Sequence, residues 1–165
     1  MERRDDIDRV MRQHGSRLLR LCTMLLGDAT LAQDAVQETF LRAWRKYSSW
    51  RGEAGEATWL TAIAVNICRD VRRSAYFRRI AREKDIAELA EPRVEFTLPD
   101  NTVITEVMRL PDKLREVILL RYYQNMKQKD IATALRLTDR AVRLRLQKAN
   151  AILRERLKEW YEDEG

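Results

Sequence analysis

The chain has 165 residues, which is enough for one compact domain or two small ones. Charged residues make up 35% of it, and a net charge of +6 with a pI near 9.6 favours a polyanionic partner, either nucleic acid or an anionic membrane surface. No long apolar run follows the N-terminus or occurs elsewhere, so the sequence predicts neither a signal peptide nor a membrane span.

Few residues are suited to metal binding or catalysis. Cys22 and Cys68 stand in apolar helical contexts, which is typical of buried, reduced thiols in a cytoplasmic protein. His14 is the only histidine, and no cluster of cysteine or histidine accompanies it. The sequence therefore predicts no metal site, no cofactor and no catalytic residues, and we expect a cytoplasmic protein that is not an enzyme.

Helical periodicity dominates the first half of the chain. Gly15 is a point where the first helix could bend, Gly27 ends that helix, and Ser74 is expected to break the last one. The segments predicted there are a helix over 7–26, a helix over 31–47, a loop over 48–56 and a helix over 58–84.

A central zone with prolines and an acidic bias separates two helical parts. We interpret 87–101 as a flexible linker between domains at 1–86 and 102–165. The predicted fold class is all-α, with two small helical domains. The helices expected after the linker cover 102–108, 111–123, 127–135 and 139–161.

The last two helices have the spacing of a helix-turn-helix, with 136–138 as the connection. Thr138 is suited to cap the second of them, and the small Ala132 lets the two helices cross closely. On a helical wheel, one side of the last helix is apolar and predicts a core face. That side carries Val142, Leu146, Ala149 and Leu153.

The opposite side of the last helix suits DNA. Arginine can read guanine, glutamine can read adenine and leucine can touch a thymine methyl group. The alternative is a helical hairpin with an ordinary solvated basic face. The predicted DNA-reading residues are Arg140, Arg143, Leu144, Gln147 and Lys148.

Three segments resemble the extracytoplasmic-function (ECF) sigma factors of bacterial RNA polymerase, within the sigma-70 family. Residues 34–44, DAVQETFLRAW, resemble their polymerase-binding helix. Residues 58–66, TWLTAIAVN, resemble the start of their promoter-opening helix. Residues 110–122, LPDKLREVILLRY, and the helix-turn-helix resemble their promoter-distal DNA-binding domain. The three segments occur in the family's order and spacing.

The resemblance implies a sigma-2 type domain at 1–86 and a sigma-4 type domain at 102–165. The first would bind the core polymerase and recognise and open the −10 element, and the second would read the −35 element. The implied partners are the β′ coiled coil and β flap of RNA polymerase, promoter DNA, and a cognate anti-sigma factor that is often anchored in the membrane. The implied signal is an envelope or extracellular stress.

The resemblance also assigns roles to residues. The polymerase contact would follow one flank of the second helix at i, i+3, i+4 and i+7 spacing, although periodicity alone leaves open whether Trp44 is a contact or a core residue. That flank consists of Asp34, Gln37, Glu38, Leu41 and Trp44. The tryptophan-rich loop 48–56 would capture a flipped base, with Asn66 at the pocket floor and arginines on the phosphates. The implied −10 residues are Trp50, Arg51, Trp59, Asn66, Arg69 and Arg73.

Two positions depart from the family's pattern. Arg136 stands in the turn where the family usually has glycine, which is useful where φ is positive. Leu144 replaces the usual serine of the recognition helix, which leaves the −35 preference open. The alternative functions are a free-standing helix-turn-helix regulator, an enzyme acting on nucleic acid and an adaptor scaffold with a basic surface.

Overall fold

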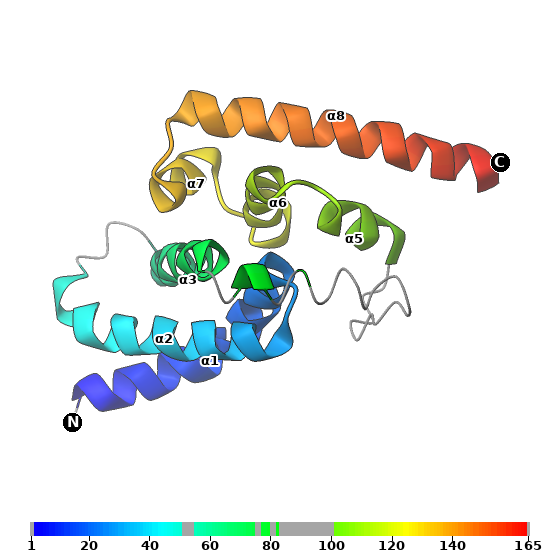
Figure 1. Ribbon diagram of the computed structural model, residues 1–165. Helices are drawn as coiled ribbons and strands as arrows, with labels where there is room; N and C mark the ends of the chain where they lie inside the picture. The colour runs from blue at the N-terminus through cyan, green and yellow to red at the C-terminus, as the bar shows by residue number, and fades with distance from the viewer. Residues whose placement is uncertain (1, 51–54, 75–76, 80–81, 83–100, 165) are drawn as a thin grey trace.

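The computed structural model describes residues 2–50, 55–74, 77–79, 82 and 101–164, and all regular secondary structure within these ranges is helical. This confirms the predicted all-α class (Figure 1). The first half contains α1 (Glu2–Leu26), α2 (Ala29–Lys46), the short 3₁₀ helix η1 (Tyr47–Ser49) and α3 (Glu56–Arg73). The second half contains α5 (Asn101–Met108), α6 (Asp112–Ile118), the π-helical turn η2 (Leu119–Tyr123), α7 (Gln128–Leu135) and α8 (Asp139–Glu164).

The first helices end close to the predicted positions, although α1 begins at Glu2 and not at the predicted residue 7. α1 runs without interruption through Gly15, and Gly27, with a φ of 67°, occupies the left-handed region just after its end. Asp28 then accepts a hydrogen bond from the backbone N–H of Leu31 at 2.9 Å and caps α2. α3 ends at Arg73 with Ser74 as its cap, which confirms the predicted break.

The linker prediction can be compared with the structure only at its end. Residues 83–100, which make up nearly all of the predicted linker and the end of the predicted long helix, lie outside the described residues. The first described residue after them, Asn101, begins α5. The domain boundaries at 86 and 102 therefore remain predictions.

The segment 111–123 is less regular than the single helix predicted for it. Pro111 caps α6, which lasts only seven residues before the backbone widens into η2. The N–H of Gln124 reaches the carbonyl of Leu119 at 3.0 Å, and Asn125 follows with a φ of 53°. This wider turn reverses the chain before α7.

The helix-turn-helix forms as predicted. Thr138 Oγ1 accepts a hydrogen bond from the backbone N–H of Ala141 at 3.1 Å, so it caps α8. Ala132 is buried where α7 meets α8. The predicted core face of α8 is buried as well, at Val142, Leu146, Ala149 and Leu153.

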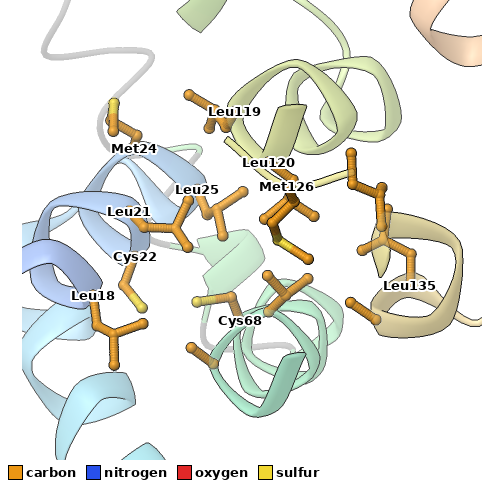
Figure 2. Packing of buried hydrophobic residues seen from close by; sticks show 14 of the residues in the cluster. Leu18, Leu21, Cys22, Met24, Leu25, Cys68, Leu119, Leu120, Met126 and Leu135 are labelled. Atoms are coloured by element: carbon orange, nitrogen blue, oxygen red, sulfur yellow. The ribbon is translucent and has the colours of Figure 1, made fainter. Parts of the chain in front are cut away.

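The two halves pack against each other. α3 lies between the α1–α2 pair and α7, and α8 covers the outer side of α6 and α7 (Figure 1). Apolar side chains continue across the boundary, and Figure 2 shows Leu21 and Leu25 of α1 close to Leu120 and Met126 of the second half. The buried residues therefore form one apolar cluster that joins both halves.

Candidate nucleic-acid interface

The predicted DNA-reading side of α8 is open to solvent. Its five residues are all exposed, and Leu144 keeps 50% of its surface accessible. The opposite side of the helix faces α6 and α7. An exposed row of three cations, one amide and one leucine next to a helix-turn-helix connection has the geometry of a recognition helix. The five residues are Arg140, Arg143, Leu144, Gln147 and Lys148.

A groove of about 820 Å³ lies between α1 and α2. Its lining is mainly apolar and includes Met11, Phe40, Leu41 and Trp44. Leu41 and Trp44 are each 45% exposed, whereas Phe40 is buried. Trp44 therefore lies outside the core, and its role as a polymerase contact remains a prediction.

The rest of the predicted polymerase-binding flank lies on the same side of α2. Asp34 and Gln37 are exposed. Glu38 is half-buried and accepts a hydrogen bond from Arg42 Nε at 3.1 Å. The flank therefore combines an apolar groove with polar and acidic neighbours.

Three aromatic residues pack on one another at the end of α2 and the start of α3. Trp50 and Trp59 are stacked, with centroids 5.2 Å apart and planes at 15°. Tyr47 lies beside both, at 5.9 Å from Trp50 and 6.1 Å from Trp59. Arg51, predicted as their neighbour in the −10 site, lies outside the described residues.

The polar residues predicted on α3 face the second half of the chain. Asn66 Nδ2 donates to the carbonyl of Ala62 at 2.8 Å and to that of Ala134 at 3.4 Å. Arg69 donates to both carboxylate oxygens of Glu116 at 3.1 Å. Arg73 is exposed and lies 3.9 Å from Asp70. The predicted −10 residues thus divide into a stacked aromatic pair, two covered polar side chains and one exposed arginine.

A polar network fixes the start of α3 on α1. Glu56 accepts hydrogen bonds from Arg9 at 3.1 Å on Oε1 and 2.9 Å on Oε2, and His14 Nε2 lies 3.0 Å from the same Oε1. The hydrogen bonds from Arg9 hold the pKa of Glu56 below its ordinary value, with a smaller contribution from His14. His14 therefore has a structural partner, and within the described ranges no group of three or more potential ligands could hold a metal ion.

Comparison with known proteins identifies the two halves. The model of sigma-70 region 2 matches residues 10–83, and that of sigma-70 region 4 matches residues 101–151. The ECF RNA polymerase sigma factor SigL of Mycobacterium tuberculosis is 35% identical over 152 residues, which cover 89% of this chain and 86% of SigL. This chain belongs to the ECF sigma factors.

Further relatives and structures agree with this family. A probable RNA polymerase sigma factor of Xanthomonas campestris, RfaY, is 33% identical over 139 residues, and the match covers 79% of this sigma factor but 35% of RfaY. The fold is similar to that of RpoE in complex with the anti-sigma factor NepR from Bartonella quintana, with a TM-score of 0.70, 21% identity and coverage of 93% and 97%. CnrH in complex with the cytosolic domain of CnrY gives a TM-score of 0.66 and 26% identity, with coverage of 94% and 90%.

Sequence reasoning singled out Asn66 and Arg69 as −10 residues but did not predict that they join regions 2 and 4 of this sigma factor, and it missed the other residues of this contact. Glu116 is only 2% exposed, and its carboxylate also accepts a hydrogen bond from Arg72. Arg17 of region 2 donates to Thr61 at 3.0 Å and to Gln124 of region 4. The one available signal was the position of Glu116 directly before an apolar run, 117–120, where a carboxylate needs a buried partner.

The cysteines of the sigma factor are structural. Cys22 and Cys68 are free thiols with no exposed surface, and Figure 2 shows them within the apolar cluster. A hydrogen bond with the Cys22 thiol and burial both raise the pKa of Cys68, so its thiolate form is disfavoured. Among the described helices, none is both long enough and apolar enough to cross a bilayer.

Proposed function

We propose that this ECF sigma factor directs core RNA polymerase to promoters with −10 and −35 elements and assists in opening them, in response to an envelope or extracellular stress. The observation that carries the proposal is the presence of two separate outward surfaces, the α1–α2 groove with Trp44 and the basic side of α8. A protein that only binds duplex DNA needs the second surface and not the first. The role proposed is that of an initiation factor and not of an enzyme.

In this proposal the exposed side of α8 reads the −35 element in the major groove. Arg140 and Arg143 supply bidentate donors, Gln147 an amide and Lys148 a phosphate contact. Leu144 has half of its surface available for a thymine methyl group, in the position where the family usually has serine. We therefore expect a −35 preference that contains thymine opposite this position.

The −10 element is assigned to the stripe of α3 that begins at Trp59 and continues through Asn66 and Arg73. Strand opening costs stacking and pairing energy, and stacking of an unpaired base on an aromatic side chain offsets part of that cost. The Trp50–Trp59 stack provides such a surface, and Asn66 can both donate to and accept from a base edge. Arg51, Arg69 and Arg73 would contact phosphates.

The α1–α2 groove is assigned to the β′ coiled coil of the core polymerase. An apolar groove with an exposed tryptophan suits a helix laid along it, and tryptophan is a common anchor of such interfaces. Asp34 and Glu38 at its side suit a basic partner. We further propose that region 4 meets the β flap.

A cognate anti-sigma factor is the remaining proposed partner. RpoE of Bartonella quintana, which has a similar fold, was solved with the anti-sigma factor NepR. We propose that a comparable protein, anchored in the membrane, restrains this sigma factor in the cytoplasm until the stress occurs.

The test is transcription in vitro with sigma-free core polymerase and genomic promoter fragments. We expect promoter-dependent transcripts only when the protein is added, and a stable complex with core. Replacing Trp44→Ala together with Glu38→Ala should abolish the complex, whereas the matched pair Arg154→Ala and Glu155→Ala, at exposed positions of α8, should not.

Two results would contradict the proposal. Duplex DNA binding without any complex with core would favour the free-standing helix-turn-helix regulator. Equal core binding by the Trp44→Ala, Glu38→Ala variant and the unaltered protein would remove the assignment of the groove.

A further inference from the structure

Side chains from both halves of the chain line a basic cleft of about 620 Å³. Its volume lies within the range of about 300 to 1,000 Å³ that is typical of small-molecule sites. Eight of the residues that line it are lysine or arginine, and only three are acids. Whether the cleft can attract a ligand depends on how many of these charges already have partners within the protein.

Each of the three acids in the cleft is already paired with arginine. Asp70 lies 3.9 Å from Arg73, and Asp112 accepts a hydrogen bond from Arg115. The third acid, Glu116, is shared by two arginines of α3. No acid of the cleft is therefore left to neutralise its remaining cations.

Four cations of the cleft have no acidic partner among the residues that the structure describes. They come from four separate parts of the chain, namely the segment after α3, the helix α6, the turn between α7 and α8, and α8 itself. None of them belongs to the predicted −10 or −35 residues. They are Arg78, Lys113, Arg136 and Arg145. Unpaired cations from several elements around one cleft suit a ligand with phosphate groups.

Arg145 lies away from the DNA-reading side of α8. On a helical wheel it stands roughly 130° from the centre of that side, so a duplex laid along the recognition face does not account for it. Arg145 is also half-buried, and a cation removed from water in part is stabilised by an anionic partner. The cleft is the place where such a partner can bind.

Arg136 contributes its charge at a cost in backbone energy. Its φ of 56° lies in the left-handed region, where glycine would be less strained. Strained residues of this kind are concentrated at functional sites. The exposed side chain of Arg136 lines the cleft, so the strained position supplies one of the four unpaired cations.

We propose that this cleft binds a small polyphosphate anion, either inorganic pyrophosphate or the phosphate chain of a nucleotide, through its four unpaired cations. Two or more linked phosphates carry enough charge and length to meet cations from several elements, whereas a single phosphate meets fewer of them. The lining comes from both halves, so the bound anion stabilises the folded chain. Binding requires none of the promoter contacts proposed for α3 and α8.

The test is titration calorimetry of the full chain at low ionic strength, with inorganic pyrophosphate, orthophosphate and guanosine triphosphate as probes. We expect a single site per chain that binds pyrophosphate at least about tenfold more tightly than orthophosphate. Tighter binding of guanosine triphosphate than of pyrophosphate would identify a nucleotide as the ligand, and equal or weaker binding would identify an inorganic polyphosphate. Equal affinity for pyrophosphate and orthophosphate, or no binding of pyrophosphate, would overturn the site.

Substitutions separate the cleft from the general charge of the protein. Arg145→Gln should weaken pyrophosphate binding about tenfold, and Arg145→Lys, which keeps the charge, should weaken it much less. The double replacement Lys113→Gln and Arg136→Gln should also weaken it about tenfold. Arg154→Gln, at an exposed position of α8 outside the cleft, is the matched control and should change it less than about twofold. Arg143→Gln should weaken binding to duplex DNA but not to pyrophosphate.

Three further outcomes would contradict the proposed site. Equal losses for Arg154→Gln and Arg145→Gln would show that general charge attracts the anion. If Arg145→Gln loses its helical circular dichroism signal, the double variant at the exposed Lys113 and Arg136 decides, and unchanged pyrophosphate affinity there overturns the site. Loss of duplex affinity in the double variant, with no pyrophosphate binding by the unaltered protein, would assign these cations to DNA.

Discussion

The basic faces of α3 and α8 belong to one chain but have opposite environments. The α8 face is open along its length, whereas Asn66 and Arg69 of α3 lie against region 4. Composition does not explain the difference, since both faces carry several cations. The packing does, because α3 lies between the α1–α2 pair and α7, whereas α8 packs only on helices of its own half. Whether the cations of a helix are exposed to solvent therefore depends on how many of its sides are packed against other helices.

The largest expected effect is on stability. It contrasts a buried leucine where the two halves meet with an exposed leucine of α8. Leu120 is fully buried next to Leu25, and Leu120→Ala should lower the free energy of unfolding by about 3 kcal/mol because it leaves a cavity. Leu144→Ala should change it by less than about 0.5 kcal/mol, since half of that side chain is already in water. Urea unfolding measures both, and similar losses would contradict the contrast.

On the open face, Arg143→Ala should weaken binding to a duplex selected from a random library by about 2 kcal/mol, roughly thirtyfold. Arg154→Ala, on the same helix beyond the helix-turn-helix, is the matched control and should cost less than about 0.5 kcal/mol. Fluorescence anisotropy gives both affinities. Comparable losses would indicate that general charge and not the recognition side of α8 determines binding.

At the start of α3, Glu56→Gln should lower the free energy of unfolding by about 1 kcal/mol at neutral pH. The hydrogen bonds from Arg9 lower the pKa of Glu56 in the folded state. The stabilisation is therefore present above the unfolded pKa, about 4.3, and is lost as the pH falls through the folded value. Denaturation of both proteins across this range should converge at low pH, and a difference that persists to about pH 2 would contradict the assignment.

The smallest effect concerns the turn between α7 and α8. Arg136 has a φ of 56°, so this non-glycine residue takes the left-handed conformation that the family's glycine would adopt at lower cost. Arg136→Gly should raise the free energy of unfolding by about 0.5 to 1 kcal/mol. Arg136→Ala keeps the backbone cost and removes the side chain, so a comparable gain there would attribute the effect to charge.

Much of the fold follows from local patterns. The helix-turn-helix, its Thr138 cap and the buried side of α8 were all predictable, because they depend on periodicity and capping within one short segment. The end of α3 at Ser74 was predictable for the same reason. The π-helical turn at Leu119–Tyr123 was not, since an apolar run of this kind continues a helix equally well.

The candidate site was predictable only in part. The position of Trp44 on an exposed flank depended on the resemblance to the family, and the structure placed it in a groove. The partnership of Glu116 with Arg69 joins residues 47 positions apart, and no periodicity connects them. Such contacts depend on how two helical units meet, which the pattern of either unit alone does not specify.

The α1–α2 pair lies on the side of α3 opposite to α7 (Figure 1), and the groove lies between the two helices of that pair. A partner helix seated beside Trp44 therefore leaves the contact between α3 and α7 intact. If the groove binds polymerase as proposed, docking there does not require the two halves to separate, whereas freeing the side chains of Asn66 and Arg69 does. The order of those two events would then be written into the packing of α3 between its neighbours.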